Sequence, residues 1–182
     1  MKLLVFHIGQ DRYGLRLNVV QRVLPLMELK RLPLAPPAVA GLMNLHGRTV
    51  PVIDLARLAG GAASAEHVDT RIVVVDYVTP QGSRALGLLA ERVLGVQDVA
   101  SHALADSGVQ AAPFLGEVAG DSEGIVQLVE PERLLPPELR AALFQPAGAA
   151  PPEDSRGGEA GNGEAGSGAT GGGANGGGAS AP

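Results

Sequence analysis

The chain reads Val50-Pro51-Val52-Ile53-Asp54-Leu55-Ala56-Arg57-Leu58 at one point and Val126-Gln127-Leu128-Val129-Glu130-Pro131-Glu132-Arg133-Leu134 at another. Each stretch is an apolar strand that ends in an acidic residue, and Arg-Leu follows the acid three residues later. Each also follows a glycine-containing lead-in, so each predicts a strand, a turn and a second strand. The 76-residue offset from Val52 to Leu128 predicts two like halves rather than solenoid repeats. Chance similarity of two short apolar strands is the open alternative.

The acid has a structural role in this pattern. Asp54 and Glu130 stand where a strand gives way to a short helix, and a carboxylate there can accept hydrogen bonds from exposed backbone N–H groups. Pro131 suits the first helical position, where no N–H is needed. We therefore expect both acids to cap helices, and we favour this reading of Asp54 over a recognition role. Pro51, within its strand, predicts an edge position.

Composition separates a folded body from a tail. Residues 146–182 contain 13 of the 26 glycines and no Leu, Ile, Val, Phe, Tyr or Met. Ordering such a segment would cost about 1–2 kcal/mol per residue in backbone entropy without apolar burial to offset it. The sequence therefore predicts one folded domain over residues 1–144, with two pseudo-repeated β lobes sharing a core, and a disordered Gly/Ala-rich tail over residues 145–182.

Charge and composition exclude several classes of function. The chain has a net charge of −5, no Trp and no Cys. Such a chain offers no phosphate-tracking surface and no base-stacking platform, so we expect no nucleic-acid partner. Apolar runs are too short for a spanning helix, so we expect no membrane insertion. The absence of cysteine excludes disulfides and fits a cytoplasmic location.

Alternating and β-branched segments predict an all-β fold with short helices. Residues 3–8 and 12–17 read as an opening hairpin, and residues 70–78 give the strongest strand signal. Residues 85–94 read as the second strand of another hairpin, and residues 101–113 as a loop. Residues 136–144 begin with proline and continue with helix formers, which predicts a short terminal helix.

One string carries a resemblance to a known family: Val39-Ala40-Gly41-Leu42-Met43-Asn44-Leu45-His46-Gly47-Arg48-Thr49-Val50-Pro51-Val52-Ile53-Asp54-Leu55. It is similar to the signature of the CheW-like coupling (adaptor) proteins of bacterial chemotaxis. Further segments, from Phe6-His7-Ile8-Gly9 to the second copy of the repeat, follow in the family's order. The resemblance covers about 135 residues and leaves only the tail outside.

The resemblance implies two small five-stranded SH3-like barrel lobes and a scaffold without enzymatic activity or cofactor. Such a scaffold links chemoreceptor cytoplasmic tips to the regulatory domain of a chemosensory histidine kinase, at receptor arrays on the inner face of the membrane. The family uses a groove between the lobes for the receptor's helical hairpin and an edge of one lobe for the kinase. The partner-binding residues that it implies here are Val20, Arg22, Val23, Asn44, His46, Gly47, Leu89 and Val93.

Two of these residues depart from the family's pattern. The family commonly has an acid where this chain has Arg22, and an arginine where it has His46. A reversed charge would repel a receptor tip suited to the ordinary version. We therefore predict a dedicated receptor or a related pathway, such as surface sensing or pilus motility.

Other functions have less support in the sequence. His7, His46, His67 and His102 have no metal-ligand spacing, and no cluster of titratable residues suggests an active site. The alternatives are a competitor for the kinase's docking edge and a small-ligand-binding barrel. We also expect Leu89→Asp or Val20→Asp to abolish receptor binding with little change in melting temperature, because alternation along a strand leaves half of its residues outside the core.

Overall fold

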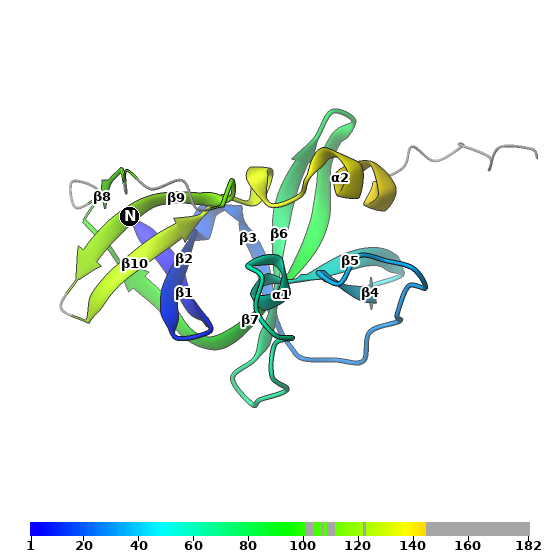
Figure 1. The fold of residues 1–182 in the computed structure, drawn as a ribbon, viewed down its shortest axis with the longest axis horizontal. Coiled ribbons are helices and arrows are strands. Elements are labelled where there is room, and N and C mark those ends of the chain that lie inside the picture. Colours follow the sequence, from blue (N-terminus) through cyan, green and yellow to red (C-terminus); the bar gives the residue numbers. More distant parts are fainter. Residues whose placement is uncertain (101–103, 107, 109–111, 122, 145–182) are drawn as a thin grey trace, which may run out of the picture. The chain divides into compact units, whose positions relative to one another are not determined.

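The computed structural model describes residues 1–100, 104–106, 108, 112–121 and 123–144, and these form an all-β fold with short helices (Figure 1). The expected terminal tail and the domain boundary after residue 144 lie outside the described residues. The strands are β1 (Lys2–Ile8), β2 (Asp11–Arg16), β3 (Val20–Pro25), β4 (Val39–Leu45), β5 (Arg48–Asp54), β6 (Arg71–Thr79), β7 (Gly82–Asp98), β8 (Leu104–Ala105), β9 (Leu115–Asp121) and β10 (Gly124–Val129). The helices are η1 (Leu17–Val19), α1 (Leu55–Leu58), η3 (Pro131–Arg133) and α2 (Pro137–Leu143).

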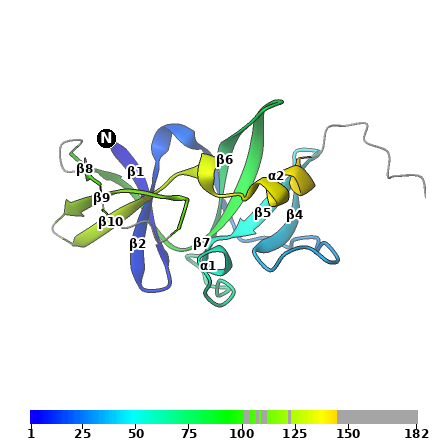
Figure 2. The same ribbon diagram turned by 45° about the horizontal axis from the view of Figure 1, so that its top comes forward.

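Two lobes share one long strand, β7 (Figures 1 and 2). Residues 82–90 of β7 pair with β6, and residues 91–98 pair with β1. Lobe 1 therefore has the strand order β7-β1-β2-β10-β9-β8, and lobe 2 has the order β3-β6-β7-β5-β4. Each lobe contains five long strands among the described residues, which agrees with the predicted pair of five-stranded barrels.

The repeat in the sequence corresponds to equivalent positions in the two lobes. In lobe 1, β10 runs parallel to β2, and Leu128 of β10 pairs with Gly14. In lobe 2, β5 runs parallel to β7, and Val52 of β5 pairs with Gly87. The two pairs occupy the same place in their barrels, so the 76-residue repeat reflects a structural duplication.

The two copies exchange strands between the lobes. Gly14 and Gly87 are 73 residues apart, and so are Arg22 of β3 and Gly95 of β7. Gly14 and Gly95 flank Val5 on β1, just as Gly87 and Arg22 flank Val74 on β6. β3 and the second part of β7 are therefore equivalent, and each joins the lobe that holds the other copy's first hairpin.

Three apolar clusters fill the described domain. Leu3, Val5, Val126 and other side chains fill lobe 1, and Met43, Val52, Leu89 and others fill lobe 2. A larger cluster joins the lobes and contains Phe6, Leu15, Ile53, Val73, Tyr77, Leu88 and Leu134. Phe144, directly after α2, stacks on Tyr77 with a centroid distance of 5.4 Å. The terminal helix predicted over residues 136–144 thus forms and packs on the shared core.

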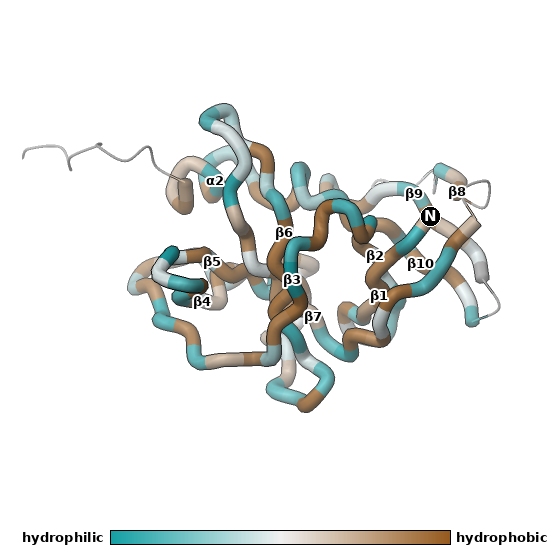
Figure 3. Tube along the Cα trace, turned by 180° about the vertical axis from the view of Figure 1, so that it is seen from behind, coloured by the Kyte–Doolittle hydropathy of each residue, from teal (hydrophilic) through white to brown (hydrophobic). Residues whose placement is uncertain are grey.

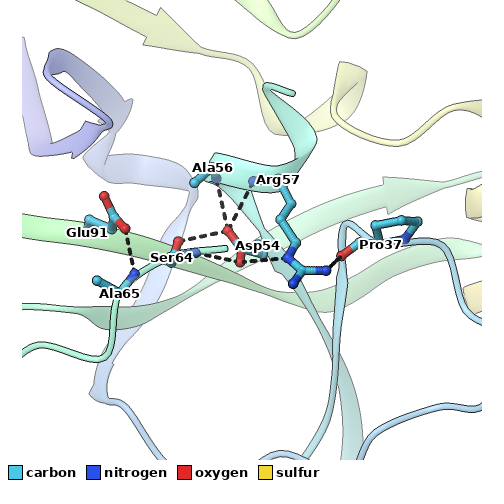
Figure 4. A network of polar contacts seen from close by, with 7 residues as sticks. All are labelled: Pro37, Asp54, Ala56, Arg57, Ser64, Ala65 and Glu91. Atoms are coloured by element: carbon cyan, nitrogen blue, oxygen red, sulfur yellow. Dashed lines mark hydrogen bonds and ion pairs between the residues drawn. The ribbon is translucent and has the colours of Figure 1, made fainter. Parts of the chain in front are cut away.

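Asp54 caps α1 as predicted (Figure 4). Its buried carboxylate accepts hydrogen bonds from the N–H of Ala56 and Arg57 at 3.0 and 3.3 Å. The N–H and hydroxyl of Ser64 donate to the same carboxylate at 2.9 and 2.8 Å and tie down the loop that follows the helix. These four donors give Asp54 a structural role.

Glu130 does not cap its helix, so that prediction is wrong. Its longer side chain extends to Arg16 and Arg133, with N···O distances of 3.7 and 3.4 Å. Pro131 does take the first helical position, as predicted. The same place in the repeat thus holds a cap in lobe 2 and two ion pairs in lobe 1.

The other local predictions were confirmed for the two hairpins but not for Pro51. The hairpins β1–β2 and β6–β7 form as expected. Pro51 is buried, and the prediction that it marks an edge strand is wrong, because β5 lies between β4 and β7. Pairing of β5 with β7 begins only at the next residue, Val52, so the strand accommodates a proline at this position. The predicted loop over residues 101–113 contains the short strand β8 and otherwise lies partly outside the described residues.

Replacing either repeat glycine with valine is expected to destabilise the domain. A Cβ on Gly87 would lie 3.0 Å from Val52 Cγ2, and one on Gly14 would lie 3.1 Å from Val126 Cγ1. We expect Gly87→Val and Gly14→Val each to lower the free energy of unfolding by about 1–3 kcal/mol, measured by urea denaturation. Gly120→Val, in open space on β9, is the control and should change stability by less than about 0.5 kcal/mol. Equal stability of the three variants would refute the close packing at these glycines.

Candidate partner-binding surface

The eight residues implied by the resemblance fall in four places. Arg22 and Val23 lie on the edge strand β3, and Asn44, His46 and Gly47 lie at the β4–β5 turn. Val20 and Val93 are half-buried and pack against the cluster that joins the lobes. Leu89 lies inside lobe 2.

The β4–β5 turn presents His46 to solvent. His46 and Gly47 are the two central residues and have φ values of 51° and 81°. Two-residue hairpin turns with positive φ at both positions match the twist of the strands, and glycine accepts that conformation at no steric cost. The N–H of Gly47 donates to Asn44 Oδ1 at 2.7 Å, which holds the turn. Asn44 therefore supports the conformation that exposes the imidazole.

Arg22 and His46 are hydrogen-bonded to each other across 24 residues of sequence. Arg22 Nη1 lies 2.9 Å from His46 Nε2, and both side chains are exposed. A guanidinium can only donate, so His46 Nε2 accepts and the imidazole proton sits on Nδ1. Among the described residues, Arg22 has no carboxylate within ion-pair distance. The two departures from the family's pattern thus form one cationic unit.

Both exchanged strands expose apolar side chains on open edges. Val23 on β3 is 42% exposed, and its equivalent on β7, Val96, is 51% exposed. Leu94, also on β7, is 53% exposed. The hydropathy view shows apolar stretches along β3 and β7 (Figure 3). β3 ends the sheet of lobe 2, and residues 91–98 of β7 end the sheet of lobe 1, so each lobe offers one such edge.

Leu89 is a core residue, and the expectation that Leu89→Asp would leave the melting temperature nearly unchanged is contradicted. Its side chain is 7% exposed among Met43, Val50, Val52, Ile72 and Val74. Alternation misleads here because residues 86–90 of β7 are buried on both faces, one toward lobe 2 and the other toward the shared core. Leu94, four residues after Ala90 on the same strand, is the exposed residue that the sequence reasoning missed.

The described residues give little support to a metal-binding, ligand-binding or membrane-spanning function. Within the described residues, no group of three or more His, Cys, Asp or Glu side chains is placed to hold a metal ion. A cavity of about 820 Å³ is lined in part by residues 26–40. The buried carboxylate in its lining is Asp54, which already accepts hydrogen bonds from Ala56, Arg57 and Ser64. In the described part of the chain, no helix is long and apolar enough to cross a bilayer.

Comparisons with known proteins agree on one family. Residues 2–138 match the CheW-like domain. The chain is 27% identical to the chemotaxis protein CheW of Klebsiella aerogenes over 151 residues, which span 78% of this chain and 86% of that protein. It is also 27% identical to the chemotaxis protein CheW of Rhizobium meliloti over 154 residues, which span 78% and 91% of the two chains. The crystal structure of scaffolding protein TtCheW from Thermoanaerobacter tengcongensis has the same fold, with a TM-score of 0.66 at 24% identity over 73% of this chain and 90% of that one.

Proposed function

Because the chain belongs to the CheW-like domain family, we propose that it is a non-enzymatic adaptor that couples a chemoreceptor to a chemosensory histidine kinase. The relatives named above are chemotaxis proteins, and the structural neighbour is a scaffolding protein. The proposed location is the cytoplasm, at receptor arrays on the inner face of the membrane. The proposed pathway is chemotaxis or a related surface-sensing or pilus-motility system.

The observation that carries the proposal is the pair of equivalent open edges. An adaptor must contact two partners at once, and β3 and β7 each present an exposed valine on a different lobe. Open edges accept further protein by strand pairing or by apolar contact. A duplicated fold with exchanged strands supplies two such surfaces without requiring a reactive group.

We assign the receptor's helical hairpin to the surface bordered by Val20, Val93 and the Arg22–His46 pair. Val20 and Val93 are equivalent in the two copies and flank the cluster that joins the lobes. Asn44 and Gly47 act through the turn that positions His46. The kinase's regulatory domain takes the free edge of one lobe. Leu89, being a core residue, has no place in this assignment.

Reconstitution with a receptor and the kinase tests the proposal. With receptor-containing vesicles and purified kinase, the chain is expected to raise receptor control of autophosphorylation, measured as phosphate incorporated with and without receptor stimulus. Val23→Asp on the β3 edge should reduce this control, because it places a charge on a docking surface. Val78→Asp, 58% exposed near the β6–β7 turn, is the matched control and should retain it.

The alternatives predict different outcomes of the same assay. A competitor for the kinase's docking edge would suppress autophosphorylation as its concentration rises. A ligand-binding barrel would leave autophosphorylation unchanged, for Val23→Asp and Val78→Asp alike. Either result, with folded protein by circular dichroism, would refute the adaptor proposal.

A further inference from the structure

The two open edges differ in charge although they are equivalent in the fold. Arg22 on β3 stands opposite Val74, and its equivalent Gly95 on β7 stands opposite Val5. One copy thus has a guanidinium where the other has no side chain. The barrel does not need a cation at this position, so Arg22 is free to serve recognition.

The charge around Arg22 is not neutralised within the described residues. Arg48, exposed beside the His46 turn, also has no carboxylate within ion-pair distance there. Asp76 is the acid closest in the strand register, and its carboxylate accepts hydrogen bonds from Gln21 and from Ser83 Oγ, the latter at 3.1 Å. Arg22 and Arg48 therefore bring two positive charges to this end of lobe 2, and the carboxylate of Asp76 lies within ion-pair distance of neither.

His46 leaves most of the guanidinium available. One Nη of Arg22 donates to His46 Nε2, while a guanidinium has five N–H donors in a planar fork. A carboxylate binds such a fork through two parallel hydrogen bonds, and a fork that is already held in place loses less entropy on binding. His46 thus acts as a positioning residue, and the exposed Val23 follows Arg22 on the same edge strand.

We propose that the Arg22–His46 pair is a specificity determinant that receives a carboxylate, so that the β3 edge binds an acidic, amphipathic segment of the receptor hairpin. The β7 edge, with Leu94 and Val96, binds an apolar surface without this charge requirement. This inference rests on the proposed adaptor function and specifies the chemistry of one partner.

Binding to a purified receptor hairpin tests the inference. The probe is the cytoplasmic hairpin of a chemoreceptor from the organism that encodes this chain, and its affinity is measured by isothermal titration. Arg22→Glu is expected to weaken binding about 10- to 100-fold, because two negative charges would face each other. Arg22→Gln should weaken it less and make the affinity less dependent on salt. His46→Asn keeps a residue that tolerates positive φ and should fall between wild type and Arg22→Gln.

Control variants separate this inference from the proposed function. Arg84→Glu makes the same charge change at an exposed site on β7, opposite Tyr77, and should bind like wild type. Replacing one acidic residue at the hairpin tip with lysine should restore binding to the Arg22→Glu variant. A general effect of surface charge would not produce this recovery. If wild type binds the hairpin but Arg22→Glu binds as well as Arg84→Glu, or more tightly than wild type, the inference is overturned and the adaptor function stands. If wild type binds neither the hairpin nor the kinase's regulatory domain, the adaptor function itself fails.

Discussion

Leu89→Asp is expected to unfold the domain. The side chain is 7% exposed within the core of lobe 2, and its backbone pairs with both β5 and β6. The substitution removes apolar contacts worth about 2–5 kcal/mol and places a carboxylate where no donor replaces water. A loss of about 5 kcal/mol would consume much or all of the stability of an ordinary domain. Urea denaturation followed by circular dichroism measures the loss.

A second aspartate on the same strand provides the control. Leu94→Asp changes a side chain that is 53% exposed, so its carboxylate stays hydrated and the free energy of unfolding should change by less than about 1 kcal/mol. This variant should still weaken binding of whichever partner docks on the β7 edge. Similar melting temperatures for Leu89→Asp and wild type would contradict the placement of Leu89 in the core.

Asp54→Ala is expected to cost about 2–4 kcal/mol of unfolding free energy. The substitution removes the helix cap and leaves the buried N–H of Ala56 and the partly buried donors of Ser64 without their acceptor. The loop that Ser64 anchors should loosen first, so the amide protons of Ala56, Arg57 and Ser64 should exchange faster with solvent than those of β5. Hydrogen exchange by NMR measures this effect residue by residue.

The repeat provides a matched comparison for Asp54. Glu130 holds the same place in the other copy, but its side chain is 21% exposed and forms ion pairs instead of a cap. Glu130→Ala should therefore cost about 1 kcal/mol or less. Equal costs at the two positions would show that the hydrogen bonds of Asp54 do not stabilise the fold.

Much of the fold could be predicted because the local sequence patterns favour the same strands and turns that the folded domain contains. The opening hairpin has alternating residues around a glycine turn, and β6 has an unbroken β-branched run. The exchange of strands could not be predicted in the same way. β7 changes lobes without a loop, bending where Arg92 and Gly95 take positive φ values of 42° and 116°, and the preceding pattern of residues gives no boundary.

The candidate site could be predicted only in part. The candidate residues on β3 and at the β4–β5 turn were predicted from the family resemblance, but the contact between Arg22 and His46 depends on how lobe 2 closes. Leu89 was misassigned because alternation implies an outer face, whereas that part of β7 lies between two cores. Pro51 misled for a related reason, since a proline can occupy a central strand where the neighbouring ladder has not yet begun.

The most direct test of the adaptor account is whether one molecule binds both partners at once. Analytical ultracentrifugation of the chain with the receptor hairpin and the kinase's regulatory domain, each at saturating concentration, measures the mass of the complex formed. We expect a ternary complex that dissociates when Val23→Asp and Leu94→Asp are combined, while each partner alone forms a binary complex with the wild-type chain. Two binary complexes that exclude each other would contradict the account, because they would mean that the partners share a single surface.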